Sequence, residues 1–137
     1  MILSILMASC SKEGSNEVKN EGDKIIVQNR SGKNDEYEQL REITDKASVE
    51  IVKDILDNIR WVNAKVSMVH PAEYKFCFAG KNEKFQSITL IYELWISPNK
   101  DKVELVIDSE SKYVQLDKNK SQRLFKLLTG ESLSGLK

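Results

Sequence analysis

The chain has 137 residues, which is enough for one domain with a modest core and too few for two ordinary domains. Hydrophobic residues make up 40% and charged residues 31%, a balance that excludes a disordered chain and an integral membrane protein. Because 21 basic and 21 acidic side chains give a formal net charge of zero, no global field draws the protein toward nucleic acid, and we expect no nucleic-acid partner.

The first stretch, MILSILMASCSKEGSNE, passes from an apolar run through a cysteine into a polar segment. Bacterial lipoprotein signals end in small residues before a cysteine that receives a diacylglyceryl group, and the sequence MASC at 7–10 fits that motif. We therefore expect residues 1–9 to be a truncated lipoprotein signal peptide, Cys10 to be lipidated, and residues 10–23 to hold this cysteine and a flexible tether. The alternative is an apolar N-terminus that folds onto the domain, with Cys10 a bystander.

A single folded domain is expected over residues 24–130. Its first candidate strand, the β-branched stretch KIIVQNR, is separated from a second candidate strand, EYEQLREI, by the turn sequence SGKND, and together they predict a hairpin. A helix follows, because apolar residues recur at helical spacing from Val49 to Ile59, and Thr44 or Asp45 can cap it.

From Trp61 onward apolar and polar residues alternate, which predicts strands within 61–68, 74–79, 88–96, 103–107 and 112–116. The short connections between these runs favour antiparallel neighbours. Asp117 or Asn119 can begin a second helix that Gly130 ends, and residues 131–137 are expected to be a loose C-terminal tail. This order predicts an α+β domain, in which a mostly antiparallel sheet of about five to seven strands carries two helices on one face.

Two long stretches carry a resemblance to a known family. They are REITDKASVEIVKDILDNIRW at 41–61 and YELWISPNKDKVELVIDSESKYVQLDKNKSQRLFKLLTG at 92–130. Together with the lipoprotein-like start, they resemble the small lipoproteins of Gram-positive bacilli that carry a YhfM-like domain. The resemblance implies a lipid-anchored, extracytoplasmic protein and carries no activity over to any residue.

No group of residues in the sequence names a reaction, a cofactor or a metal. His70 is the single histidine, whereas metal sites usually need several His or Cys ligands at fixed spacing. A catalytic pair of Cys77 and His70 is imaginable across a turn, but a cysteine between Phe76 and Phe78 in a strand is more often a buried, protonated thiol. We therefore expect no catalytic, cofactor-binding or metal-binding residue and no enzyme.

One face of the predicted sheet is less easily assigned. If Leu90, Tyr92 and Leu94 face the helices, then Ile91 and Trp95 face the other way. That back face is either covered, by KIIVQNR or another segment, or open as a binding surface. Ile91, Trp95 and His70 are accordingly the candidate binding surface.

These observations favour a monomeric, lipid-anchored protein at the outer face of the cell membrane. Its expected function is that of a non-catalytic binding module for a protein or an envelope component. One alternative is a cell-envelope hydrolase that uses sheet or loop carboxylates such as Glu93, Glu104, Asp108 and Glu110. A thiol-based redox role for Cys77 is a third possibility.

Overall fold

The alternating stretches of the chain pair into one sheet. The computed structural model describes residues 22–32, 36–85, 88 and 90–136. Within these ranges the elements are, in chain order, β1 (Lys24–Arg30), β2 (Tyr37–Ile43), α2 (Lys46–Asp57), β3 (Val62–Asn63), β4 (Tyr74–Ala79), β5 (Tyr92–Ile96), β6 (Val103–Ile107), η3 (Asp108–Glu110), β7 (Lys112–Gln115), α3 (Lys118–Thr129) and η4 (Leu133–Gly135). The seven strands of this described part form one antiparallel sheet in the order β2-β1-β4-β5-β6-β7-β3.

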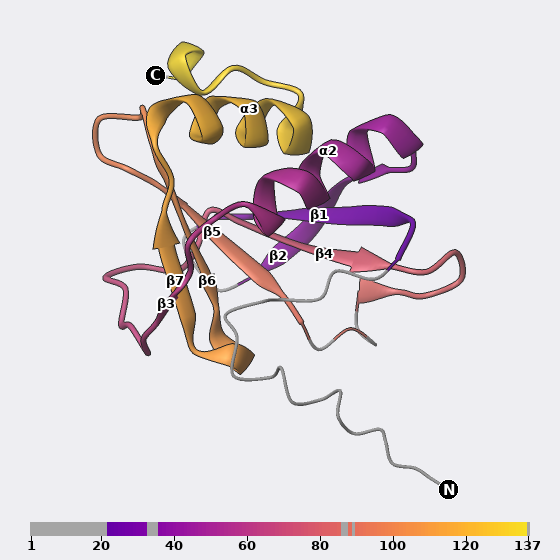
Figure 1. Ribbon diagram of the computed structural model, residues 1–137, viewed down its shortest axis with the longest axis horizontal. Helices are drawn as coiled ribbons and strands as arrows, with labels where there is room; N and C mark the ends of the chain where they lie inside the picture. Colours follow the sequence, from indigo (N-terminus) through magenta and orange to yellow (C-terminus); the bar gives the residue numbers. More distant parts are fainter. Residues whose placement is uncertain (1–21, 33–35, 86–87, 89, 137) are drawn as a thin grey trace, which may run out of the picture.

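Both α2 and α3 lie on the same face of the sheet (Figure 1). Their apolar sides and the front side chains of the strands form the main core, in which Val52 and Leu124 of the helices are fully buried. Tyr92 stacks on Phe76 across β5 and β4, with ring centroids 4.8 Å apart. The predicted α+β fold, with a sheet of five to seven strands and two helices on one face, is confirmed.

The helices begin and end at residues that the sequence marks. Asp45 accepts a hydrogen bond from the Ser48 backbone N–H at 3.0 Å, and Asp117 accepts one from the Lys120 backbone N–H at 2.8 Å. This second bond holds the pKa of the Asp117 carboxyl below its usual value. Gly130 ends α3 with φ of +82°, a left-handed conformation that favours glycine.

The strand expected over 61–68 is mostly wrong, because β3 spans only Val62–Asn63 at the edge of the sheet. The chain from 64 to 73 instead crosses the back face, where Val66 and Met68 pack against Trp95. A segment that lays every second side chain onto a sheet has the same alternation as a strand, so period alone does not distinguish the two.

The residues after α3 also differ from the expected loose tail over 131–137. Leu133 is fully buried in the main core, and Leu136 packs against it. The reversal of the chain at Gly130 directs this segment back onto the helical face, where burying a leucine stabilises its position.

Ser121 of α3 connects the helix to two strand ends. Its buried hydroxyl accepts a hydrogen bond from the Val103 backbone N–H at 2.9 Å and donates one to the Leu116 carbonyl at 3.2 Å.

Ser121→Ala leaves the Val103 N–H without this partner, so we expect the free energy of unfolding to fall by about 1–3 kcal/mol in urea denaturation. The control Ser109→Ala, at an exposed serine in η3, should change it by less than about 0.5 kcal/mol. Equal losses in the two variants would contradict this role.

Candidate functional site

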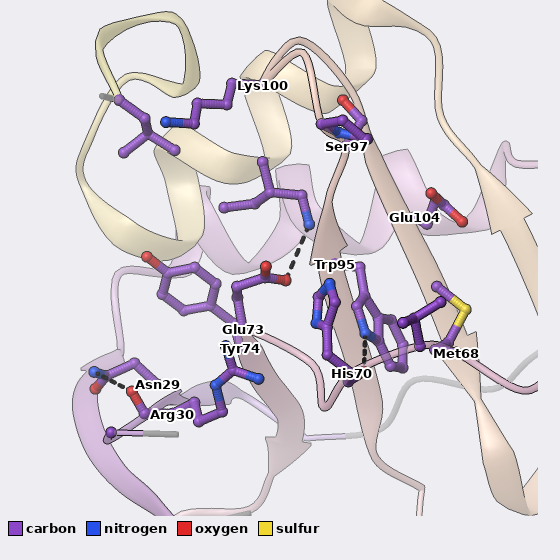
Figure 2. Close-up of a pocket in the computed structure, with 15 residues that line it drawn as sticks. Asn29, Arg30, Met68, His70, Glu73, Tyr74, Trp95, Ser97, Lys100 and Glu104 are labelled. Carbon is purple, nitrogen blue, oxygen red and sulfur yellow. Dashed lines mark hydrogen bonds between the residues drawn. The ribbon is translucent and has the colours of Figure 1, made fainter. Parts of the chain in front are cut away.

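An open cleft of about 730 Å³ lies at the end of the sheet where β4 begins. Its walls come from the last residues of β1, the last residues of β5 and the segment just before β4 (Figure 2). The cleft exists because the chain leaves the line of β4 before Tyr74, and Ala72 packs instead on the back face against Trp95 and Val106. No strand of the described chain fills the position that β4 vacates beside the end of β5.

Three side chains fix the segment before β4 by binding three consecutive carbonyl groups. The Trp95 Nε1–H donates to the His70 carbonyl at 2.8 Å, and the Arg30 Nη1–H donates to the Pro71 carbonyl at 2.8 Å. The Tyr37 hydroxyl donates to the Ala72 carbonyl at 2.7 Å. Because the donors belong to β5, β1 and β2, the segment is anchored to three strands and the cleft wall is pre-organised.

The tip of this segment is an exposed ridge. Val69 is 99% exposed, and His70 beside it is exposed as well. The ridge has the main cleft on one side and a second hollow of about 410 Å³ on the other, and Val69, His70 and Trp95 line both. A single exposed valine is common on protein surfaces, so it is the position of Val69 between the two hollows that makes the ridge a candidate contact surface.

The charged side chains of the main cleft differ in the hydrogen bonds and ion pairs that they make. Glu73 accepts a hydrogen bond from the Ile96 backbone N–H at 3.2 Å, and Glu104 accepts one from the Tyr113 hydroxyl at 2.8 Å. Burial and this bond to Glu104 raise the pKa of Tyr113 to about 12. The three basic side chains of the cleft make no ion pair within the described residues; they are Arg30, His70 and Lys100.

The structure brings two of the three candidate residues together, His70 and Trp95, and places the third, Ile91, elsewhere. His70 is exposed at the cleft, but Trp95 is only 6% exposed and supports the ridge from below instead of forming an open platform. Ile91 packs elsewhere on the back face, against the cluster that contains Cys77. The back face is thus covered by residues 64–73 and by Phe85, Ile88 and Ile91, and Cys10 lies outside the described residues.

Sequence reasoning missed Arg30, Glu73 and Lys100 as cleft residues. Arg30 and Glu73 are charged residues at strand ends, a position that ordinarily indicates a solvated turn. For Lys100 the sequence shows only the turn SPNKD; its φ of +59° and the bond from its N–H to the Ser97 carbonyl at 2.8 Å are visible only in the structure. Their convergence depends on the pairing of β1, β4 and β5, which no local pattern encodes.

A catalytic pair of Cys77 and His70 is not formed. The Cys77 side chain is fully buried on the back face beside Ile26 and Ala79, whereas His70 is exposed and its Nδ1–H donates to the Pro71 carbonyl at 2.9 Å. Burial, with a smaller contribution from the Glu83 carboxylate, raises the pKa of the Cys77 thiol to about 12. The thiol is therefore protonated at neutral pH and does not act as a nucleophile.

Comparison with known protein families adds one finding. The family model described as YhfM protein matches residues 18–134, which include both α-helices and all seven strands of the described chain. The chain belongs to the YhfM family. No curated protein and no solved structure is significantly similar to the chain. The YhfM description names no activity.

Two further findings concern the described residues of this YhfM protein. The described residues contain no group of three or more His, Cys, Asp or Glu side chains placed to hold a metal ion. In the same part of the chain, neither helix has the length and hydropathy that crossing a bilayer requires.

The pKa of Cys77 gives a prediction for its reactivity. In a Cys10→Ser variant, which leaves Cys77 as the single thiol, iodoacetamide at pH 8 should label the native protein at least about 100-fold more slowly than the urea-unfolded protein. The reason is that both the thiolate fraction and the access of the reagent are reduced by burial. Mass spectrometry measures the labelling rate. Equal rates in the native and the unfolded protein would contradict the buried position of Cys77 and restore the redox hypothesis.

Proposed function

We propose that this protein is a non-catalytic binding module that is lipid-anchored at Cys10 on the outer face of the cell membrane. It binds a protein or an envelope component through the main cleft and the ridge of Val69 and His70. The observation that carries the proposal is the pre-organised open cleft beside a fully exposed apolar ridge.

Pre-organisation supports binding because a surface that is already ordered loses little conformational entropy when a partner docks. The three carbonyl groups of residues 70–72 are held by side chains of three strands, so the ridge keeps its shape without a ligand. An exposed valine, an exposed imidazole and the ammonium group of Lys100 then offer apolar and polar contacts side by side.

The polar groups around the cleft support binding over hydrolysis. Ser97, the serine of the cleft, donates its hydroxyl to the Asp101 carboxylate at 3.1 Å and accepts from the Lys102 backbone N–H at 3.1 Å. These bonds stabilise the turn between β5 and β6 rather than activating a nucleophile. Glu93, one of the carboxylates considered for a hydrolase, lies 3.8 Å from the Lys75 ammonium group, as surface ion pairs do.

The anchor is supported by the sequence MASC at 7–10 and by the polar residues that follow it. The position of the cleft relative to the start of the described chain is compatible with a cleft that faces away from the membrane. The described chain enters beside Ala79, where the Asp23 N–H donates to the Ala79 carbonyl at 3.1 Å, and the cleft lies at the opposite end of β4. The six residues of this strand span about 20 Å, so a tethered domain presents the cleft away from its attachment point.

The binding proposal is tested by an amide-shift titration of the full chain carrying Cys10→Ser with cell-wall and membrane extracts. We expect shifts at Val69, His70 and Lys100, and at least about a fivefold weaker response in Val69→Ser. Val62→Ser is the matched control, because Val62 is also exposed, at 51%, but lies on the far edge strand β3. Shifts that avoid the cleft, or an equal effect of the two substitutions, would contradict the proposal.

The anchor has its own test. With a complete signal sequence in a Gram-positive host, the wild-type chain should appear in the membrane fraction with a mature mass that corresponds to diacylglyceryl-modified Cys10. Cys10→Ala should abolish both the modification and the membrane localisation. Unprocessed protein in the cytosol in both cases would refute the anchor and leave the cleft proposal standing.

A further inference from the structure

The main cleft is a gap in the sheet between β1 and β5. The last hydrogen bonds that β4 makes on its two sides both involve Glu73. Its carbonyl accepts from the Arg30 N–H at 3.0 Å, and its N–H donates to the Leu94 carbonyl at 3.0 Å. The residues that precede Glu73 in the chain lie on the back face, whereas β5 continues through Ile96.

Ile96 therefore directs its backbone N–H into the gap. The next N–H along the chain, that of Ser97, donates to the Lys102 carbonyl across the β5–β6 turn, and successive N–H groups of a strand point in opposite directions. In place of a neighbouring strand, the Oε1 atom of Glu73 accepts the Ile96 N–H at 3.2 Å, as the dashed line from Glu73 shows in Figure 2. A side-chain carboxylate thus occupies the position of a main-chain carbonyl.

The walls of the gap suit the alternating side chains of an extended peptide. On the helical face the gap meets Tyr74 and Leu136, which pack against the main core. On the back face it meets Trp95 and the ridge at His70. A strand in the gap would direct successive side chains to these two faces in turn, which is how added strands are recognised.

Lys100 is the charged side chain of the gap that has no partner among the described residues. Glu73 and Glu104 already accept hydrogen bonds, from Ile96 and Tyr113. Lys100 makes no side-chain hydrogen bond or ion pair with any described residue, and its turn is held by the bond from the Lys100 N–H to the Ser97 carbonyl at 2.8 Å. An acidic side chain of a ligand would therefore find, at the rim of the gap, an ammonium group that no described side chain pairs with.

We propose that the gap binds an extended acidic peptide segment of a partner protein by strand addition to β5. A carbonyl of the peptide replaces the Glu73 carboxylate at the Ile96 N–H, and an acidic side chain of the peptide pairs with Lys100. This inference rests on the proposed function, because it names the kind of ligand that the cleft of the binding module takes.

The test uses two capped hexapeptides, one of alternating valine and glutamate and one of alternating valine and lysine, titrated into the full chain carrying Cys10→Ser. The acidic peptide should shift the amide of Ile96 and the indole N–H of Trp95 and should bind at least about tenfold more tightly than the basic one. Methylation of the central amide nitrogens of the acidic peptide should weaken binding by about tenfold, because strand addition needs main-chain hydrogen bonds.

Two substitutions separate this mode from a general electrostatic attraction. Lys100→Glu should weaken the binding of the acidic peptide by about tenfold. The control Lys81→Glu makes the same charge change beyond the other end of β4 and should alter the binding by less than about twofold. Glu73→Ala should tighten binding by at least about threefold, because the group that competes for the Ile96 N–H is removed. A purely structural role of Glu73 would weaken it instead. If Glu73→Ala fails to fold, the methylated peptide and Lys100→Glu still decide the question.

Equal binding of the two peptides, shifts away from Ile96, or no binding of either peptide at millimolar concentration would overturn the inference. Its failure is distinguishable from failure of the proposed function. Extracts that shift Val69 and His70, when the acidic peptide binds nowhere, would refute the peptide alone. Extracts and peptides that all leave the cleft unchanged would refute both.

Discussion

The central strands of the sheet are apolar on both faces, while both described helices cover only one of them. On the helical side Phe76 and Leu94 belong to the main core, and on the other side Cys77 and Trp95 are equally withdrawn from water. Exposing that second set would cost on the order of 25 cal/mol for each square ångström of apolar surface. The back face must therefore be covered by segments that are neither helix nor strand, and this requirement shapes the rest of the molecule.

Covering the back face produces the cleft. Because Ala72 packs on Trp95, the chain leaves the line of β4 before Tyr74 and a strand position beside β5 stays vacant. Residues 70–72 of the covering segment pair with no described strand, yet their carbonyl groups still need donors. Trp95, Arg30 and Tyr37 supply them, so the same side chains that satisfy the backbone also hold the rigid ridge beside the cleft.

This origin explains why the surface suits binding. A vacated strand position retains the geometry of a sheet, including a main-chain N–H that Glu73 caps through its side chain. Exchanging that cap for a ligand carbonyl preserves the number of hydrogen bonds at Ile96 and leaves the core undisturbed. The basic side chains at the rim can then contribute selectivity through charge, while the apolar ridge contributes contact area.

The sequence by itself determined the α+β class, the end of α3 at Gly130 and the side of the sheet to which Ile91 and Trp95 belong. It limited each helix start to two residues, of which the structure uses Asp45 and Asp117. These features follow from caps and from periods of two or 3.6 residues, which act over a few neighbours. The strand order, the covered state of Trp95, the burial of Leu133 and the meeting of Arg30, Glu73 and Lys100 were decided only by the tertiary structure. They depend on contacts between residues far apart in the chain, and a segment that covers a sheet has the same alternation as one that joins it.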